Sequence, residues 1–187
     1  MQIKALLLTP LLAAGFASAA PQKSTTFEAI ALRSASKIHH EPLQAVKNHL
    51  ALNVAKQGAS CDAKSDNNAV FNLVGDELFL FRRSATPQQL YVDRSGMGQG
   101  VIGYTTGAQS PPRNSERKGW KIDKDGNLTF DGDDFLACPD SKKAGGSWRV
   151  WANVGIRSPA DSKNCQRFSA RVLKDTKPNS CEYTQQQ

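Results

Sequence analysis

The chain has 187 residues, about the length of one domain, and 39% of them are hydrophobic and 22% charged. Its 14 glycines and 9 prolines are too few for collagen or a disordered linker. Lysine and arginine exceed aspartate and glutamate by seven. The basic residues are scattered, which excludes sequence-specific nucleic-acid binding and is compatible with weak attraction to anionic wall polymers.

The N-terminal segment, residues 1–19, is predicted to be a secretory signal peptide. Lys4 supplies the positive charge, residues 5–16 form an apolar run too short to span a bilayer, and residues 17–19 are a small-residue cleavage site. We therefore expect residues 20–187 to form a single secreted domain. The C-terminal residues 181–187 carry no hydrophobic tail, so no membrane anchor is expected.

Short β-strands dominate the pattern that follows. Ten to twelve are expected, the clearest at 27–32, 70–74, 78–81, 90–92, 101–104, 120–122, 128–130, 135–138, 148–151 and 168–172. The run 78–81 is apolar on both faces and indicates a buried strand. Asp125-Gly126, between two alternating runs, is a strong hairpin signal. Outside the signal peptide, helical periodicity is limited to a weak run near 43–52.

The pattern predicts an all-β fold, a single compact antiparallel barrel or sandwich, with a β-trefoil as the alternative. Four cysteines lie in the expected mature part, at positions 61, 138, 165 and 181. An even number in an oxidising compartment predicts two disulfides, Cys61, Cys138, Cys165 and Cys181 pairing in one of three ways. The absence of a Cys-x-x-Cys pair argues against a zinc knuckle or a thioredoxin-type site.

Aspartates form the most conspicuous cluster of candidate functional residues, at positions 123, 125, 131, 133 and 134. Paired carboxylates can catalyse glycoside hydrolysis, and Asp131 and Asp133 would share a face if they lay in a strand. Hairpin turns explain these residues with fewer assumptions, because Asp and Gly are the residues that such turns favour. The cluster does not fit an EF-hand calcium loop, because Gly126 is the fourth residue counted from Asp123, whereas the EF-hand glycine is the sixth.

Other candidates are weaker. The glycines of residues 96–100 do not fit a dinucleotide fingerprint and are expected to allow positive φ in a turn. His39, His40 and His49 precede the dense strand region and are expected to be solvated; no metal, cofactor or catalytic residue is predicted. Trp148 and Trp151 fall on opposite strand faces, and one exposed tryptophan would indicate a carbohydrate platform. Asn127-Leu128-Thr129 is an N-glycosylation sequon.

Two segments carry a resemblance that covers essentially the whole expected mature chain. Residues 20–36 (APQKSTTFEAIALRSAS) and 90–107 (LYVDRSGMGQGVIGYTTG) resemble the PhiA family of fungal cell wall proteins. The C-terminal part is similar, more loosely, to the cysteine-bearing domain of yeast PIR wall proteins, at 119–123, 125–128, 134–138 and 164–165. The glutamine-rich repeats through which PIR proteins attach to glucan are not present, so covalent wall linkage is not implied.

The resemblance implies a secreted, wall-associated, non-enzymatic protein required for phialide and conidium formation, in a family that includes mould allergens. It supplies no catalytic residues. Cell wall polysaccharide is the expected partner, held weakly or non-covalently. The alternatives are a secreted carbohydrate-binding module, a small wall hydrolase that uses the aspartates, and a soluble protectant against stress that adsorbs toxic small molecules.

Overall fold

The structure is a computed structural model that describes residues 23–84, 86–140 and 145–185. The predicted signal peptide, residues 1–19, lies outside this range. No helix in the described residues is long and apolar enough to cross a membrane. The strands are β1 Ser24–Leu32, β2 Gln44–Val46, β3 His49–Leu52, β4 Ser60–Cys61, β5 Phe71–Val74, β6 Glu77–Leu80, β7 Gln88–Asp93, β8 Val101–Thr106, β9 Ser115–Glu116, β10 Trp120–Ile122, β11 Asn127–Phe130, β12 Phe135–Pro139, β13 Trp148–Ala152, β14 Gln166–Lys174 and β15 Cys181–Glu182.

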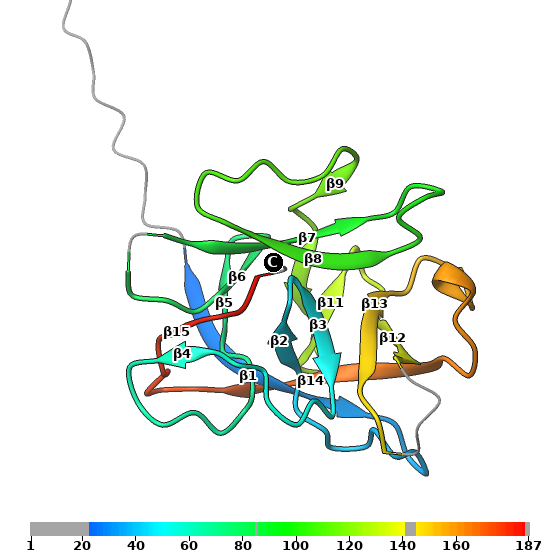
Figure 1. Cartoon of the computed structure of the whole chain (residues 1–187), viewed down its shortest axis with the longest axis horizontal. Coiled ribbons are helices and arrows are strands. Elements are labelled where there is room, and N and C mark those ends of the chain that lie inside the picture. The colour runs from blue at the N-terminus through cyan, green and yellow to red at the C-terminus, as the bar shows by residue number, and fades with distance from the viewer. Residues whose placement is uncertain (1–22, 85, 141–144, 186–187) are drawn as a thin grey trace, which may run out of the picture.

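Nine of these strands close into an antiparallel barrel, in the order β1-β5-β6-β7-β8-β3-β13-β12-β14, with β14 pairing back onto β1 (Figure 1). Four further strands extend it: β2 beside β3, β9 beside β7, β11 beside β14 and β10 beside β11. β4 and β15 form a separate two-stranded sheet. The predicted all-β class is therefore confirmed, and the chain adopts the barrel, not the sandwich or the β-trefoil.

The two longest strands, β1 and β14, have nine residues each and close the ring in a register that runs from Phe27↔Lys174 to Leu32↔Ser169. Along β1 the side chains alternate, and Phe27, Ala29 and Ala31 point into the barrel with at most 1% of their surface exposed. The largest fully buried side chains fill the interior: Trp120, Tyr104, Tyr183, Phe27, Phe71, Phe135 and Phe168. The barrel thus encloses a packed core.

One hairpin and one further tight turn follow directly from turn chemistry. Between β10 and β11, Gly126 has a φ of 79° and the Asp123 carboxylate accepts a hydrogen bond from the Asn127 amide at 2.8 Å, so the predicted hairpin at Asp125-Gly126 is confirmed. After β11, Asp131 and Gly132 both have positive φ, 52° and 87°, and Phe130 and Asp133 exchange backbone hydrogen bonds. This geometry is that of a type I′ turn.

The weak helical pattern near residues 43–52 was misleading, because this segment is the β2–β3 hairpin. Lys47 and Asn48 form its turn with φ of 46° and 64°, values that a right-handed helix does not contain. Leu43, Leu50 and Leu52 are all fully buried, and it is this burial that produces the apolar spacing. Tertiary packing overrides the local periodicity here.

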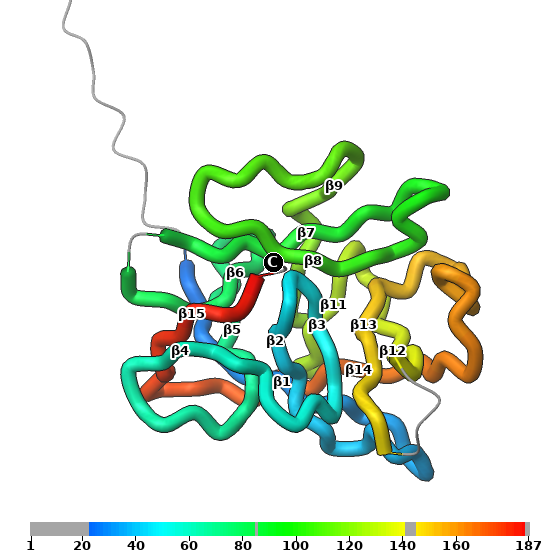
Figure 2. Tube along the Cα trace, viewed as in Figure 1, coloured from blue at the N-terminus to red at the C-terminus, as the bar shows by residue number. Residues whose placement is uncertain are grey.

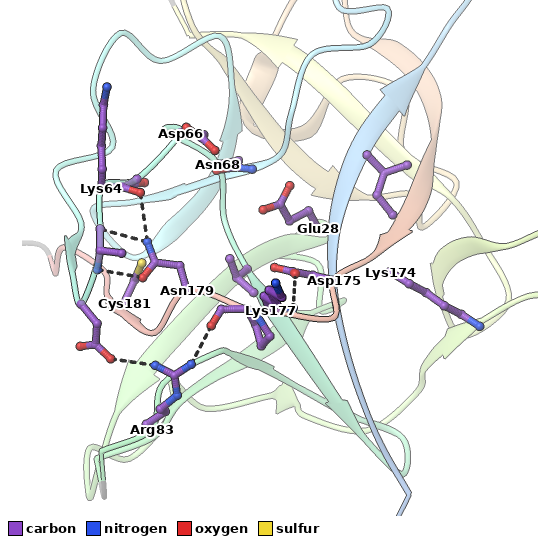
Figure 3. Close-up of a pocket in the computed structure, with 16 residues that line it drawn as sticks. Glu28, Lys64, Asp66, Asn68, Arg83, Lys174, Asp175, Lys177, Asn179 and Cys181 are labelled. Atoms are coloured by element: carbon purple, nitrogen blue, oxygen red, sulfur yellow. Dashed lines mark hydrogen bonds and ion pairs between the residues drawn. The ribbon is translucent and has the colours of Figure 1, made fainter.

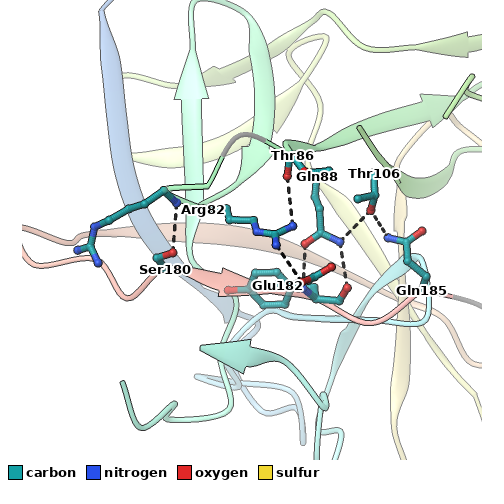
Figure 4. Close-up of polar contacts among 9 residues, drawn as sticks. Arg82, Thr86, Gln88, Thr106, Ser180, Glu182 and Gln185 are labelled. Atoms are coloured by element: carbon teal, nitrogen blue, oxygen red, sulfur yellow. Dashed lines mark hydrogen bonds and ion pairs between the residues drawn. The ribbon is translucent and has the colours of Figure 1, made fainter. Parts of the chain in front are cut away.

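The C-terminal segment runs across one end of the barrel, next to the β2–β3 hairpin (Figure 2). Tyr183 is 1% exposed, and its hydroxyl oxygen accepts a hydrogen bond from the Val70 amide at 2.9 Å. Burial raises the pKa of Tyr183 to about 12. The fully buried Gln88 holds the backbone of the same residue, because its Nε2 donates to the Tyr183 carbonyl at 2.9 Å and its Oε1 accepts from the Tyr183 amide at 2.8 Å (Figure 4).

Replacing Gln88 with Glu should lower the free energy of unfolding by about 3 kcal/mol, because the donor to Tyr183 is replaced by a buried carboxylate. The change is measured by urea denaturation at pH 7. Gln89→Ala is the matched control, since that side chain is half-buried and bonds only to Glu77, and it should cost about 1 kcal/mol or less. Equal losses in the two variants would contradict the clamping role of Gln88.

Candidate functional site

A polar cavity of about 550 Å³ opens between β1, the loop 62–68 and the segment 173–181 (Figure 3). The Glu28 carboxylate points into it from β1. Its lining is partly apolar and includes Val70, Leu173 and Cys181. The remaining lining is polar or charged apart from Ala63 and Pro178: Asp62, Lys64, Ser65, Asp66, Asn68, Arg83, Lys174, Asp175, Lys177 and Asn179.

Hydrogen bonds and a disulfide hold the two walls of this cavity together. The Asn179 amide pairs with the backbone of Ala63, accepting from its N–H at 3.1 Å and donating to its carbonyl at 3.0 Å. Arg83 bridges the walls by donating to the Asp62 carboxylate and to the Pro178 carbonyl, each at 3.1 Å. These planar groups fix the mouth of the cavity before any ligand arrives.

The fold shifts the pKa of Glu28, which lines this cavity. Burial raises its pKa above the ordinary value, and the nearby charges of Asp175 and Asp66 raise it further. A hydrogen bond from the Asn68 side chain opposes these effects by stabilising the ionised form. The sequence analysis missed Glu28, because in the sequence it is one polar residue of an alternating strand.

Two disulfides join the four cysteines. Cys61 bonds to Cys181, linking β4 to β15, and Cys138 bonds to Cys165, with sequence separations of 120 and 27 residues. The structure therefore selects one of the three pairings that the sequence left open. Cys138 and Cys165 belong to a small apolar cluster on the outside of the barrel, with Leu136, Trp151 and Val101.

Arginines form ion pairs with three aspartates of the cluster, Asp131, Asp133 and Asp134. Arg94 donates to Asp131 and Glu116, at 2.5 Å each, and its guanidinium lies 5.7 Å from the centre of the Phe130 ring. Arg167 pairs with Asp134 at 2.6 Å and with Asp133 at 3.8 Å. Asp131 and Asp133 flank a turn instead of sharing a strand face, so the strand-borne carboxylate pair considered for catalysis does not form.

This second region is also hollowed. One hollow of about 350 Å³ is lined by Arg94, Phe130, Asp131, Asp133, Asn153 and Val154. Another of about 590 Å³ is lined by Asp133, Leu136, Asn153, Gly155, Ile156, Arg157, Cys165 and Arg167. Because Asp133 and Asn153 line both hollows, we treat the two as one surface groove, here called the arginine groove.

The three tryptophans all lie in the described residues, and none is exposed. Trp120 is fully buried in the core, where its ring is 5.0 Å from Phe130. Trp148 packs against the barrel core and Trp151 against the outer cluster, so they occupy opposite faces as predicted. An exposed tryptophan platform for carbohydrate is therefore not present.

The glycine-rich turn and the histidines also differ in part from expectation. Only Gly100 of the three glycines in residues 96–100 has a positive φ, 91°, whereas a Cβ on Gly98 would lie 2.2 Å from the Asp93 side chain. His39 and His40 stack at 3.8 Å between ring centres. His49 is half-buried, and burial lowers its pKa, with Arg149 lowering it further. Among the described residues, no His, Cys, Asp and Glu side chains are grouped to hold a metal ion.

Together, these features define a disulfide-bridged β-barrel protein with polar surface sites. The chain belongs to the family of PhiA-like secreted proteins, whose family profile matches residues 27–184. Relatives named cell wall protein phiA are 46% identical in Aspergillus fumigatus (99% of this chain, 100% of the relative), 42% in Aspergillus niger (98% and 99%) and 40% in Emericella nidulans (90% and 91%). The protein is a secreted fungal cell wall protein. No solved structure gives a significant match.

Glu28→Gln should raise the free energy of unfolding at pH 7 and leave it unchanged at pH 3. A raised pKa means that the folded state favours the protonated form, so the parent loses stability as the pH rises through that pKa, whereas glutamine stays neutral. Chemical denaturation at the two pH values measures the difference. In an Asp175→Asn background the gain should shrink, since one cause of the raised pKa has been removed. A gain that is independent of pH would refute this account of Glu28.

Proposed function

We propose that this protein is a non-catalytic component of the fungal wall that acts in asexual development, in the formation of phialides and conidia. The observation that carries the proposal is membership of the PhiA-like family along nearly the whole chain. Two disulfides and a packed barrel are suited to a protein that must persist outside the cell. A further role in stress protection is compatible with the same features.

The chemistry of the aspartate cluster supports a non-catalytic role. A hydrolase of the usual kind needs a positioned acid and a positioned base, with at least one pKa tuned towards the working pH. Asp131 and Asp133 are instead bound to different arginines at a turn. Asp123 caps its own hairpin, and hydrogen bonds from Asn127 hold its pKa below the ordinary value.

One observation favours a second candidate function, a small wall hydrolase. Glu28 lies in a cavity with Asp175 and Asp66, and its raised pKa is a property of general acids in glycosidases. The hydrolase alternative therefore moves from Asp131 and Asp133 to Glu28. Its test is turnover of wall polymers by the purified protein.

We expect no release of reducing sugar from β-glucan, chitin or mannan by the parent protein, Glu28→Gln, Asp131→Asn or Asp133→Asn. In a strain that lacks the parent gene, conidium counts should fall, and each of the three variants should restore them because none removes a catalytic group. Turnover by the parent that Glu28→Gln abolishes would establish the hydrolase. Normal conidiation without the gene would refute the developmental role.

We also propose that Asn127 carries an N-linked glycan. It lies at the start of β11 beside an exposed hairpin turn, with its Nδ2 3.4 Å from the Asp123 carboxylate. Asn179-Ser180-Cys181, the other sequon-like triplet, is different, because Cys181 forms a disulfide.

Asn127→Gln should increase the gel mobility of the secreted protein, because the glycan is lost. Thr129→Ser is the matched control, since it keeps the sequon and should leave the mobility unchanged. Endoglycosidase treatment of the parent should give the mobility of Asn127→Gln. An unchanged mobility for both Asn127→Gln and the treated parent would mean that the site is unoccupied.

A further inference from the structure

The polar side chains of the arginine groove hold one another in place. Arg94 is fixed by two carboxylates, and Arg167 by Asp133 and Asp134. Asn153 is fixed as well, because its Nδ2 donates to Asp134 at 3.2 Å. A ligand would meet groups that are already positioned, so little side-chain entropy is lost on binding.

These groups match the hydroxyls of a sugar. Guanidinium groups and the Asn153 amide donate planar sets of N–H groups, while the carboxylate of Asp133 accepts, so vicinal hydroxyls can be bound in pairs. Between the polar groups lie Val154 and Ile156, which are half-buried and present apolar surface to the groove. A pyranose ring has the same arrangement, with hydroxyls at its edge and C–H groups on its faces.

The charges of the groove favour a neutral ligand over an anionic one. Arg94 and Arg167 form ion pairs with four carboxylates, those of Glu116, Asp131, Asp133 and Asp134, and Arg157 adds a third positive charge to the lining. Arg157 is exposed and has no ion pair with the described carboxylates. A phosphorylated or acidic polymer would have to displace the carboxylates that hold Arg94 and Arg167, at the cost of charge-assisted hydrogen bonds.

We propose that the arginine groove binds a neutral hexopyranose chain of the cell wall. Because two hollows meet at Asp133 and Asn153 and both are open to solvent, the groove can take adjacent sugar units from the middle of a chain. The proposal rests on wall association and names the ligand and the surface that provide it. It requires no exposed tryptophan, which this barrel does not have.

The test is binding of the purified full-length protein to gluco-, chito- and manno-oligosaccharides by calorimetry, in 1 M NaCl, where the screening length of about 3 Å suppresses ionic adsorption of a basic protein. The Asp133→Ala, Arg157→Ala double variant should bind about tenfold more weakly than the parent, equivalent to about 1.4 kcal/mol. Both side chains are exposed, so the fold should be retained. Arg157→Ala alone, which breaks no ion pair, serves as a second variant and should bind more weakly than the parent.

Lys177→Ala, at the exposed rim of the cavity in Figure 3, is the matched control and should bind like the parent. Comparison of the gluco-, chito- and manno-oligosaccharides identifies which wall polymer the groove binds. Three results would overturn the proposal. The parent protein binds none of the oligosaccharides, the groove variants bind with the same affinity as the parent, or Lys177→Ala weakens binding. Fractionation of fungal culture into medium, detergent-extracted wall and glucanase-released wall tests wall association separately. A failure of wall association can therefore be distinguished from a failure of sugar binding by the groove.

Discussion

The pairing of β1 with β14 is the contact on which the rest of the molecule depends. It converts an open sheet into a barrel, which pairs the edges that β1 and β14 would otherwise expose and encloses the aromatic core. It also places both polar sites, because β14 carries Arg167 at its start, in the arginine groove, and Lys174 at its end, in the cavity that contains Glu28. The seven residue steps from Arg167 to Lys174 span about 23 Å of strand. A single strand therefore sets the separation of the two surfaces.

Side-chain amides, in addition to apolar contacts, attach the loops and the C-terminal segment to this barrel. Gln88 pairs with the backbone of Tyr183 as a neighbouring strand would, and Asn179 does the same for Ala63. Gln44, which is 2% exposed, accepts from the Val54 amide and donates to its carbonyl. Buried amides of this kind stabilise only when both of their partners are present, so they favour one arrangement of the loops over the alternatives. A surface built in this way can remain polar and still be rigid.

The sequence predicted the elements better than their assembly. All ten of the clearest predicted strands overlap strands of the structure, because alternation and turn residues such as Asp125-Gly126 are local signals. The pairing of Cys61 with Cys181 and the closure of β1 on β14 join residues more than a hundred positions apart, and no local pattern encodes such contacts. The aspartates were correctly interpreted as turn residues, but their arginine partners come from distant strands and loops. Glu28 escaped notice because its neighbours Asp66 and Asp175 are brought to it only by the fold.

The separation of Cys61 from Cys181 has a consequence for how the protein is made. Proteins enter the secretory pathway from the N-terminus, so Cys61 reaches the oxidising lumen 120 residues before its partner, with Cys138 and Cys165 arriving in between. During that interval β1 has no β14 to pair with, and the Cys61 thiol can form mixed bonds with either of the other two cysteines. The Cys61–Cys181 bond can therefore form only after nearly the whole chain has been translocated, and any earlier bond of Cys61 must first be reversed by thiol–disulfide exchange. The rate of secretion should accordingly depend on the disulfide isomerase capacity of the cell.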